Sequence, residues 1–461
     1  MGAIAITLGL VVGALVLYIL RVNHVLSQTP PEAEAQLDPP MTREHIEQVY
    51  KRVKENGINW TASLPSRRDR RYVIAGGSGL VGSHIALFLL DMGVPPQAIR
   101  LLDIRAPAMA EFSSGAPSEI PFIKTDITSE ASVADAFNAT WDDSVAELPL
   151  TVFHTAAVIR PFERYPIFYH RCHRVNVLGT AHVLAAAREA GAGLFIYTSS
   201  SNAGASAVNW VSPPWIRAPR NFVQTVGDDD YFEPMKPASE FPTNYAVSKA
   251  EAERLVCAAD GNMRTAAIRP GNGVYGHRND RIIGHMLEVR KMPSFSEPWA
   301  QTWVNVRNVA LGHLLLESAL LGEHADKVAG RPFMVSDGGA PLRYRDLYKI
   351  LSTASSTGFQ IIVPPPILLF ILAYCLEIYC LLLAKVPFLQ RFLREPSESM
   401  GMLQPGTISS ASSTFTDCTS AKRAPADGGI GYRPVCTTLE GLCAQLVDWN
   451  RAMETESGKG S

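Results

Sequence analysis

Residues 71–105 read RYVIAGGSGLVGSHIALFLLDMGVPPQAIRLLDIR, and this stretch decides the fold of the chain. The apolar run that ends at Gly76 predicts a short strand. Apolar residues at helical spacing from Val81 to Met92 then predict a helix that stops before Gly93. A second apolar run, Ile99 to Ile104, predicts another strand. Strand, glycine turn, helix and strand in this order predict the start of a doubly wound parallel sheet, a Rossmann fold of the α/β class.

The glycine turn is typical of a dinucleotide-binding site. Its three spaced glycines allow a tight turn, an approach of the backbone to a pyrophosphate, and close packing of the helix on the strand. Asp103, near the end of the second strand, would accept hydrogen bonds from ribose hydroxyls and would repel a 2′-phosphate. NAD is therefore expected, with NADP less favoured because Arg105 lies nearby. The residues predicted to bind the cofactor here are Gly76, Gly79, Leu80, Val81, Gly82 and Asp103.

Three more apolar runs predict parallel strands that extend the sheet, at residues 122–127, 152–157 and 194–198. Asp126 and Ile127 end the first of these. The Asp126 carboxylate could bind an adenine amino group or could cap the helix that follows, and both alternatives stay open. Ala156 and Ala157 end the next strand, where small side chains let a cofactor lie against the backbone.

Three polar side chains predict the chemistry. Ser200 follows the fifth strand, at the edge of the sheet where such folds bind ligands. Tyr245 and Lys249 are four residues apart, which places them on one face of a helix. A phenol has an ordinary pKa of about 10, and a neighbouring lysine favours the phenolate. We therefore predict that Tyr245 takes the proton of an alcohol, that Lys249 assists it and holds the nicotinamide ribose, and that Ser200 positions the alcohol oxygen.

The order of these motifs resembles the extended short-chain dehydrogenase/reductase superfamily. The motifs are GGSGLVG from Gly76, HTAA from His154, YTSSS from Tyr197, YAVSK from Tyr245 and IRPG from Ile268. Within the superfamily, WVNVRNVA from Trp303, followed by His313 and Leu314, is similar to a stretch of the 3β-hydroxysteroid dehydrogenase branch. That branch includes sterol-4α-carboxylate 3-dehydrogenases, which also decarboxylate.

The resemblance implies NAD-dependent oxidation of a ring 3β-hydroxyl on a steroid or sterol, with loss of carbon dioxide where a 4-carboxylate is present. It implies Tyr245 as the proton acceptor, Lys249 as its partner and Ser200 as the catalytic serine. Two alternatives stay open: a nucleotide-sugar epimerase or dehydratase that uses the same residues, and a non-catalytic scaffold that senses NAD.

The chain departs from the family between Ser200 and Tyr245, where an insert carries prolines, an aromatic residue and three consecutive aspartates. These residues are Pro213, Pro214, Trp215, Pro219 and Asp228, Asp229 and Asp230. The insert could be a lid over an apolar substrate or an ordinary surface loop.

Two apolar segments indicate a membrane. Gly2 to Leu20 contains no charged residue and gives about 28 Å of helix, enough to cross a hydrocarbon core. The alternative is a cleaved signal peptide. Basic residues after this segment place the body on the cytosolic side, and we expect the endoplasmic reticulum membrane. The N-x-T sequons at Asn59 and Asn138 test this orientation.

Residues 361–384 form the second apolar segment and contain Glu377. A straight crossing helix would have to hide this charge, so a hairpin or an interfacial segment is expected, with a core helix as the alternative. The expected organisation is an anchor at 1–21, a linker with an amphipathic helix at 22–70, a cofactor domain at 71–270, a smaller substrate-binding part at 271–356, a membrane-associated segment at 357–395, a flexible loop at 396–430 and a closing helix at 431–461 that returns to the core.

Composition limits the other partners. With 42 basic and 44 acidic residues among 461, the chain has no charge excess that would suit nucleic acid. The seven cysteines lack metal-ligand spacing, so no metal site is expected. The expected partners are a small lipid or sterol substrate and the membrane, and the choice between a monomer and a homodimer stays open.

Overall fold

The structure is a computed structural model that describes residues 2–210, 213, 215–216 and 218–458. Its centre is a sheet of seven strands in which every neighbouring pair is parallel. From one edge to the other the strands are β3 (Phe122–Lys124), β2 (Ile99–Asp103), β1 (Arg71–Ala75), β4 (Leu150–His154), β5 (Leu194–Thr198), β7 (Arg264–Pro270) and β12 (Pro332–Val335). The predicted doubly wound Rossmann sheet is confirmed. Its strand order reverses between β1 and β4, where such sheets bind ligands.

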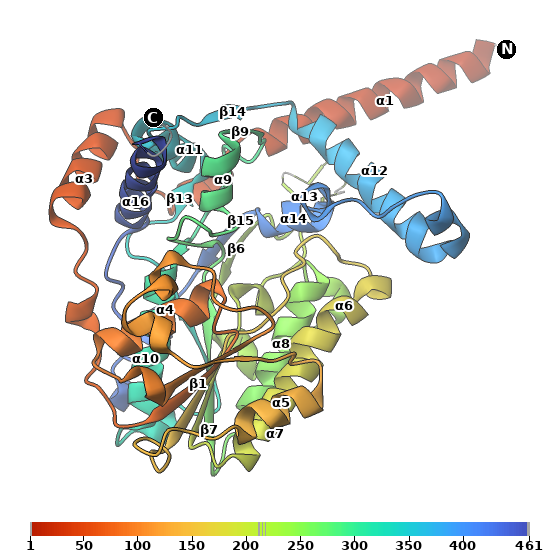
Figure 1. Cartoon of the computed structure of the whole chain (residues 1–461). Coiled ribbons are helices and arrows are strands. Elements are labelled where there is room, and N and C mark those ends of the chain that lie inside the picture. The colour runs from red at the N-terminus through yellow and green to blue at the C-terminus, as the bar shows by residue number, and fades with distance from the viewer. Residues whose placement is uncertain (1, 211–212, 214, 217, 459–461) are drawn as a thin grey trace.

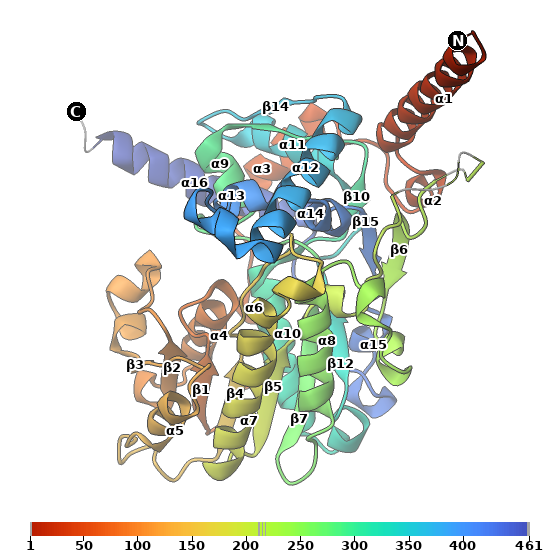
Figure 2. The ribbon, with the colours of Figure 1, turned by 90° about the vertical axis from the view of Figure 1, so that its right-hand side faces the viewer.

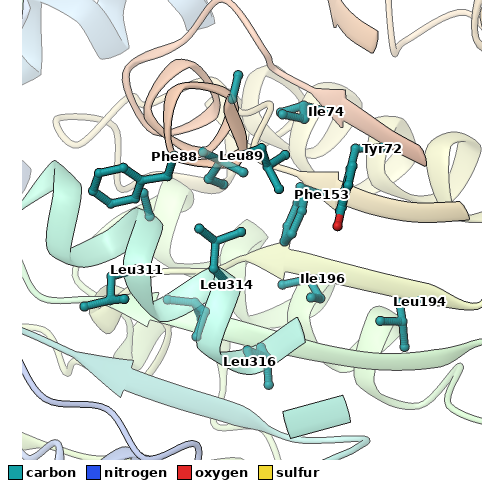
Figure 3. Close-up of a cluster of buried hydrophobic side chains, with 14 of the residues drawn as sticks. Tyr72, Ile74, Phe88, Leu89, Phe153, Leu194, Ile196, Leu311, Leu314 and Leu316 are labelled. Atoms are coloured by element: carbon teal, nitrogen blue, oxygen red, sulfur yellow. The ribbon is translucent and has the colours of Figure 1, made fainter. Parts of the chain in front are cut away.

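Helices cover both faces of the sheet (Figure 1). The helices α4 (Leu80–Asp91) and α10 (Val306–Leu320) pack on one face. The helices α5 (Glu130–Asn138), α7 (Gly179–Glu189) and α8 (Asn244–Cys257) pack on the other. The alternation along β5 explains this arrangement, because Leu194 and Ile196 face α10 while Phe195 and Tyr197 face α7 and α8. Figure 3 shows buried side chains on the face of the sheet that α4 and α10 cover.

We expected residues 71–270 to form the whole sheet, but the sheet extends beyond them. Strand β12 and helix α10 come from the part assigned to substrate binding, and they complete the sheet and its cover. The third and fourth strands also end three residues earlier than predicted, at Lys124 and His154. Asp126, Ile127, Ala156 and Ala157 therefore lie in the loops beyond the strand ends.

A second, smaller lobe lies above the carboxyl ends of the strands (Figures 1 and 2). Three of its helices pack together: α3 (Arg43–Asn56), α11 (Tyr344–Ala354) and α16 (Thr438–Gly458). Thr42 caps α3 by accepting a hydrogen bond from the His45 N–H. Residues from both ends of the chain thus build this lobe, although residues 459–461 of the closing segment lie outside the described part.

The prediction of a flexible loop at 396–430 was wrong. This segment contains α13 (Glu398–Gly401), α14 (Pro405–Ser410), β15 (Ser413–Thr416) and α15 (Thr419–Lys422). Strand β15 pairs in parallel with β6 (Val223–Val226) of the insert, and Ser412, Ser413 and Thr414 are buried. The serine- and threonine-rich composition misled the prediction, because pairing with a distant strand satisfies the backbone groups here.

The insert is packed into the smaller lobe over part of its length. Trp210 is buried and contacts Phe222 edge to face, with ring centroids 5.7 Å apart, whereas Trp215 is exposed. Pro214 lies outside the described residues. The insert is therefore attached to the smaller lobe at Trp210 and through β6. It is not a loop that is tethered only at its two ends.

Two helices, α1 (Gly2–Leu26) and α12 (Pro366–Lys385), are long and apolar enough to cross a membrane by length and composition. Helix α1 is longer than the expected anchor and projects from the body (Figure 1). Helix α12 is a single helix and not a hairpin. One face of α12 is buried at Phe370, Ala373 and Glu377, and its other face exposes Leu368, Ile371, Leu372 and Ile378.

Candidate active site

The three motif glycines do different work at the end of β1. Gly76 has a positive φ of 85°, and a Cβ added there would lie 2.4 Å from the Ala156 nitrogen. A Cβ on Gly82 would lie 2.4 Å from the Gly76 oxygen. At Gly79 an added Cβ would meet only the Gly76 oxygen within 4 Å, at 3.2 Å. The first and third glycines are therefore required by packing, whereas the second leaves open space above the start of α4.

Asp103 lies beside this turn, as predicted. Its carboxylate accepts hydrogen bonds from the backbone N–H of Ser78 at 3.2 Å and of Ile104 at 2.7 Å, and burial raises its pKa. The Ser78 hydroxyl is buried and has no hydrogen-bond partner within the described residues. Leu80 and Val81 are half-buried at the start of α4. A gap at Gly79, an unpaired hydroxyl, a helix start and a strand-end carboxylate together fit a dinucleotide.

The next two strand ends complete the edge of this turn. The Asp126 side chain is exposed and accepts from the backbone N–H and the hydroxyl of Thr128, which lowers its pKa. The residue that caps α5 is Ser129, so the capping alternative for Asp126 is wrong. Ile127 is buried, while Ala156 and Ala157 are half-buried in the loop after β4, with Ala156 against Gly76.

Ser200 and Tyr245 are brought together at the end of β5. The Ser200 side chain acts on the Tyr245 phenol to lower its pKa, although burial of the phenol outweighs this effect and raises that pKa to about 12. The two residues lie 45 positions apart in the chain and come from different elements: Ser200 follows β5, and Tyr245 is the second residue of α8. The structure thus forms the predicted pair of hydroxyls at the ligand-binding edge of the sheet.

Lys249 lies one turn further along α8 and is also buried. Its Nζ donates hydrogen bonds to the Thr198 carbonyl at 2.7 Å and to the Tyr197 hydroxyl at 3.2 Å. Burial lowers the pKa of Lys249 to about 7, partly offset by Glu253. The prediction that Lys249 lowers the pKa of Tyr245 is not met by the side chains alone, because burial disfavours the charged form of both groups.

Two residues of the site had no predicted role. Tyr197 contacts Lys249, and the alternation along β5 would have placed it on the α8 side. Asn176 is fully buried, exchanges two hydrogen bonds with the backbone of Val158, and donates a third to the Ser248 hydroxyl at 2.9 Å. Its polarity within an apolar helix was the available signal, because a buried amide needs partners. Asn176 ties the loop after β4 to the catalytic helix.

Comparison with known proteins agrees with this geometry. The 3-beta hydroxysteroid dehydrogenase/isomerase family matches residues 73–360. The 3 beta-hydroxysteroid dehydrogenase type 7 of Mus musculus is 27% identical, over 83% of this chain and 96% of the relative. The decarboxylating sterol-4-alpha-carboxylate 3-dehydrogenase of Candida albicans is 26% identical, over 58% of this chain and 69% of the relative.

Solved structures share the fold at lower identity. The UDP-glucose 4-epimerase of Thermotoga maritima has a TM-score of 0.53 at 18% identity, over 83% of this chain and 99% of the other. A UDP-glucose-4-epimerase from Stenotrophomonas maltophila, solved with bound NAD, has a TM-score of 0.53 at 16% identity, over 84% and 99%. These likenesses support the extended short-chain dehydrogenase/reductase fold.

A parallel sheet with a glycine turn and a Ser-Tyr-Lys set defines an oxidoreductase of the short-chain dehydrogenase/reductase class. More narrowly, the chain belongs to the 3-beta hydroxysteroid dehydrogenase/isomerase family. Its family and fold support a nicotinamide dinucleotide as the cofactor.

Proposed function

We propose that this protein oxidises the 3β-hydroxyl of a sterol-like lipid with NAD, and that it decarboxylates the product where the substrate carries a 4-carboxylate. The single observation that carries the proposal is that Ser200 and Tyr245 lie together at the end of β5, with Lys249 on the next turn of α8. The relatives among steroid and sterol dehydrogenases support the substrate class.

Tyr245 is the proposed proton acceptor. The alcohol oxygen binds between the Ser200 and Tyr245 hydroxyls and passes its proton to the Tyr245 phenolate. NAD, when bound, accepts the hydride from carbon 3. Lys249 stabilises the phenolate and holds the nicotinamide ribose. Because burial, partly offset by Ser200, raises the pKa of Tyr245 to about 12, the phenolate needs positive charge beside it, which a protonated Lys249 supplies.

Decarboxylation needs no further catalytic residue. Oxidation leaves a ketone at carbon 3 next to the carbon that bears the carboxylate. The bond between carbon 4 and the carboxylate breaks, carbon dioxide leaves, and the electron pair forms an enolate at the carbon 3 oxygen. Tyr245 then returns its proton to carbon 4, directly or through water, so the phenolate is restored.

The proposed cofactor residues are the glycine turn from Gly76 to Gly82, Asp103, the Asp126–Ile127 loop, Ala156 and Ala157, together with Tyr245 and Lys249. The Asp103 carboxylate favours NAD because it would repel a 2′-phosphate. The Ser78 hydroxyl and the backbone at Gly79 would face the pyrophosphate.

We also propose that the protein is anchored in the endoplasmic reticulum membrane with its catalytic part in the cytosol. Helix α1 would cross the bilayer, whereas α12 would lie in the interface with its exposed apolar face toward lipid. The Arg164–Glu377 ion pair supports this arrangement, because it holds one face of α12 on the catalytic lobe. Expression in cells tests it: the sequons at Asn59 and Asn138 stay unglycosylated if the proposal is right, and glycan at either contradicts it.

The activity is tested with the full chain in detergent, NAD and a 4α-carboxysterol, by following NADH and the 3-ketosterol. Tyr245→Phe should lower kcat by about 10²- to 10⁴-fold while cofactor binding is kept. Turnover of a UDP-sugar without net NADH would instead support the epimerase alternative. A Tyr245→Phe protein that complements a cell lacking this chain would support the scaffold alternative.

A further inference from the structure

A chain of polar side chains leads from Ser200 into the smaller lobe. The backbone N–H of Asn202 donates to the Ser200 hydroxyl oxygen at 3.2 Å, and the side-chain Nδ2 of Asn202 lies 3.4 Å from the same oxygen. That Nδ2 also lies 3.4 Å from Oδ1 of Asn272, which follows β7. The Asn202 amide is therefore the polar neighbour of the proposed catalytic serine on the lobe side.

The far end of this polar chain is firmly held. The Asn272 Nδ2 donates to the Gln301 Oε1 and to the Ser410 carbonyl of α14, and the Tyr344 hydroxyl donates to the same Gln301 oxygen at 2.8 Å. Gln301 and Tyr344 are buried, whereas Asn202 and Asn272 are only half-buried. Both 3.4 Å contacts of the Asn202 side chain are long for hydrogen bonds. The Asn202 amide is thus next to a well-bonded residue, Asn272, but its own hydrogen bonds are weak. A ligand can therefore replace them.

The position of Asn202 matches a particular part of the proposed substrate. If the alcohol oxygen of carbon 3 lies between the Ser200 and Tyr245 hydroxyls, a substituent on the adjacent carbon 4 lies beside it. A carboxylate oxygen there is about one hydrogen-bond length, roughly 3 Å, from the alcohol oxygen. The Asn202 Nδ2, at 3.4 Å from the Ser200 oxygen, lies at the same scale of separation.

We propose that Asn202, supported by Asn272, binds the 4-carboxylate of the substrate and makes the enzyme prefer carboxylated sterols. This inference rests on the proposed function. The basic side chains on neighbouring segments already have partners within the protein, which leaves the carboxylate to the amide. Lys236 donates to the Gly204 and Ala205 carbonyls, and Arg160 pairs with Glu163.

A neutral amide also suits the decarboxylation. The carboxylate must lose its charge when carbon dioxide leaves, and that charge moves to the carbon 3 oxygen between Ser200 and Tyr245. A cation at the carboxylate would stabilise the starting state more than the transition state and would slow this step. A neutral amide holds the carboxylate in place but stabilises its charge less than a cation would, so it opposes the loss of carbon dioxide less.

The test compares two substrates that differ only at carbon 4: a 4α-carboxysterol and the same 3β-hydroxysterol without the carboxylate. Asn202→Asp keeps the size of the side chain and adds a like charge, and Asn202→Ala removes the amide. With the full chain in detergent and NAD, we expect wild type to prefer the carboxylated sterol. Either variant should lower kcat/KM for that sterol at least about tenfold, mainly through KM, and change the other sterol less than about threefold.

The matched control is Asn279→Ala, since Asn279 is an exposed asparagine outside this network, and it should change neither substrate. Asn272→Ala should reproduce the loss of preference if Asn272 supports Asn202. An equal loss on both substrates in the Asn202 variants would overturn the inference, because Asn202 would then act only through Ser200. A wild type that oxidises both sterols equally would overturn the inference and leave the proposed function standing. A wild type that oxidises neither would overturn the proposed function itself.

Discussion

Arg164 and Glu377 form a bidentate ion pair, with Nε–Oε1 and Nη2–Oε2 distances of 2.6 and 2.7 Å, between the loop after β4 and helix α12. Glu377 is almost completely buried. Two turns earlier on α12, the Phe370 ring contacts the Trp210 ring, with ring centroids 5.3 Å apart. One charged and one aromatic contact therefore hold an otherwise apolar helix on the catalytic body. The same loop reaches the catalytic helix, because the Glu163 carbonyl accepts from the Asn244 N–H, next to Tyr245.

Breaking this pair should release α12. Arg164→Ala leaves a buried carboxylate without its partner, which we expect to cost about 2–4 kcal/mol of local stability. Limited proteolysis around residues 357–397 should become faster, and labelling at the half-buried Cys380 should increase. Lys385→Ala, at an exposed cation on the same helix, is the control. Equal proteolysis of both variants would contradict a docking role for the pair.

The glycine turn predicts two different defects. Gly82→Ala places a methyl group 2.4 Å from the Gly76 oxygen, so the backbone must move, and we expect a loss of about 2–4 kcal/mol in unfolding free energy. Gly79→Ala meets little protein and should fold nearly normally, yet the methyl group occupies the space left for the cofactor. Thermal unfolding and NAD titration separate the two. Normal NAD affinity in Gly79→Ala would contradict the assigned site.

The burial of Lys249 should lower the free energy of unfolding. Its pKa in the folded chain, about 7, lies below the ordinary 10.5, so between these values the unfolded chain holds a proton that the folded chain has released. Stability then rises with pH through that window, and the burial cost is greatest below pH 7. Lys249→Met should stabilise the cofactor-free protein at pH 7 by about 1–2 kcal/mol and flatten its dependence between pH 7 and 10. Unfolding curves at several pH values measure this, with Lys385→Met as control; an unchanged slope would refute it.

Asp103 should set the choice of cofactor. Asp103→Ser removes the carboxylate beside the Ser78 N–H, and we expect the NADP/NAD ratio of kcat/KM to rise by about tenfold or more. Asp126→Ser is the comparison, because Asp126 is exposed and bonded to Thr128. A larger shift at Asp126 than at Asp103 would move the ribose site to the next strand.

The catalytic sheet was readable from sequence because its signals are local. Strand β5 was predicted at its observed bounds, Leu194–Thr198, and the amphipathic helix expected within residues 22–70 is present as α3, Arg43–Asn56. Long-range pairing was not readable. Nothing in Ser413–Thr416 indicates that it pairs with β6, 190 residues earlier, so a strand was taken for a flexible loop.

The candidate site divides in the same way. Residue types and spacing predicted Ser200, Tyr245 and Lys249, and the fold brings the side chains of the first two together. The effect of burial on their pKa values was not predictable, because it depends on what covers the site. Asn202 was given no role from the sequence, and its partner Asn272 follows a different strand.

The seventh strand has a consequence for how the protein is made. Strand β12 is synthesised more than 250 residues after β1 and pairs with β7 to close the sheet edge, while α16 completes the smaller lobe later still. The ribosome must therefore release nearly the whole polypeptide before either lobe is finished. Throughout that interval the apolar N-terminal helix is already outside the exit tunnel. A premature stop before Pro332 would leave β7 paired with β5 on one side only, so the sheet would end at an exposed strand that β12 otherwise covers.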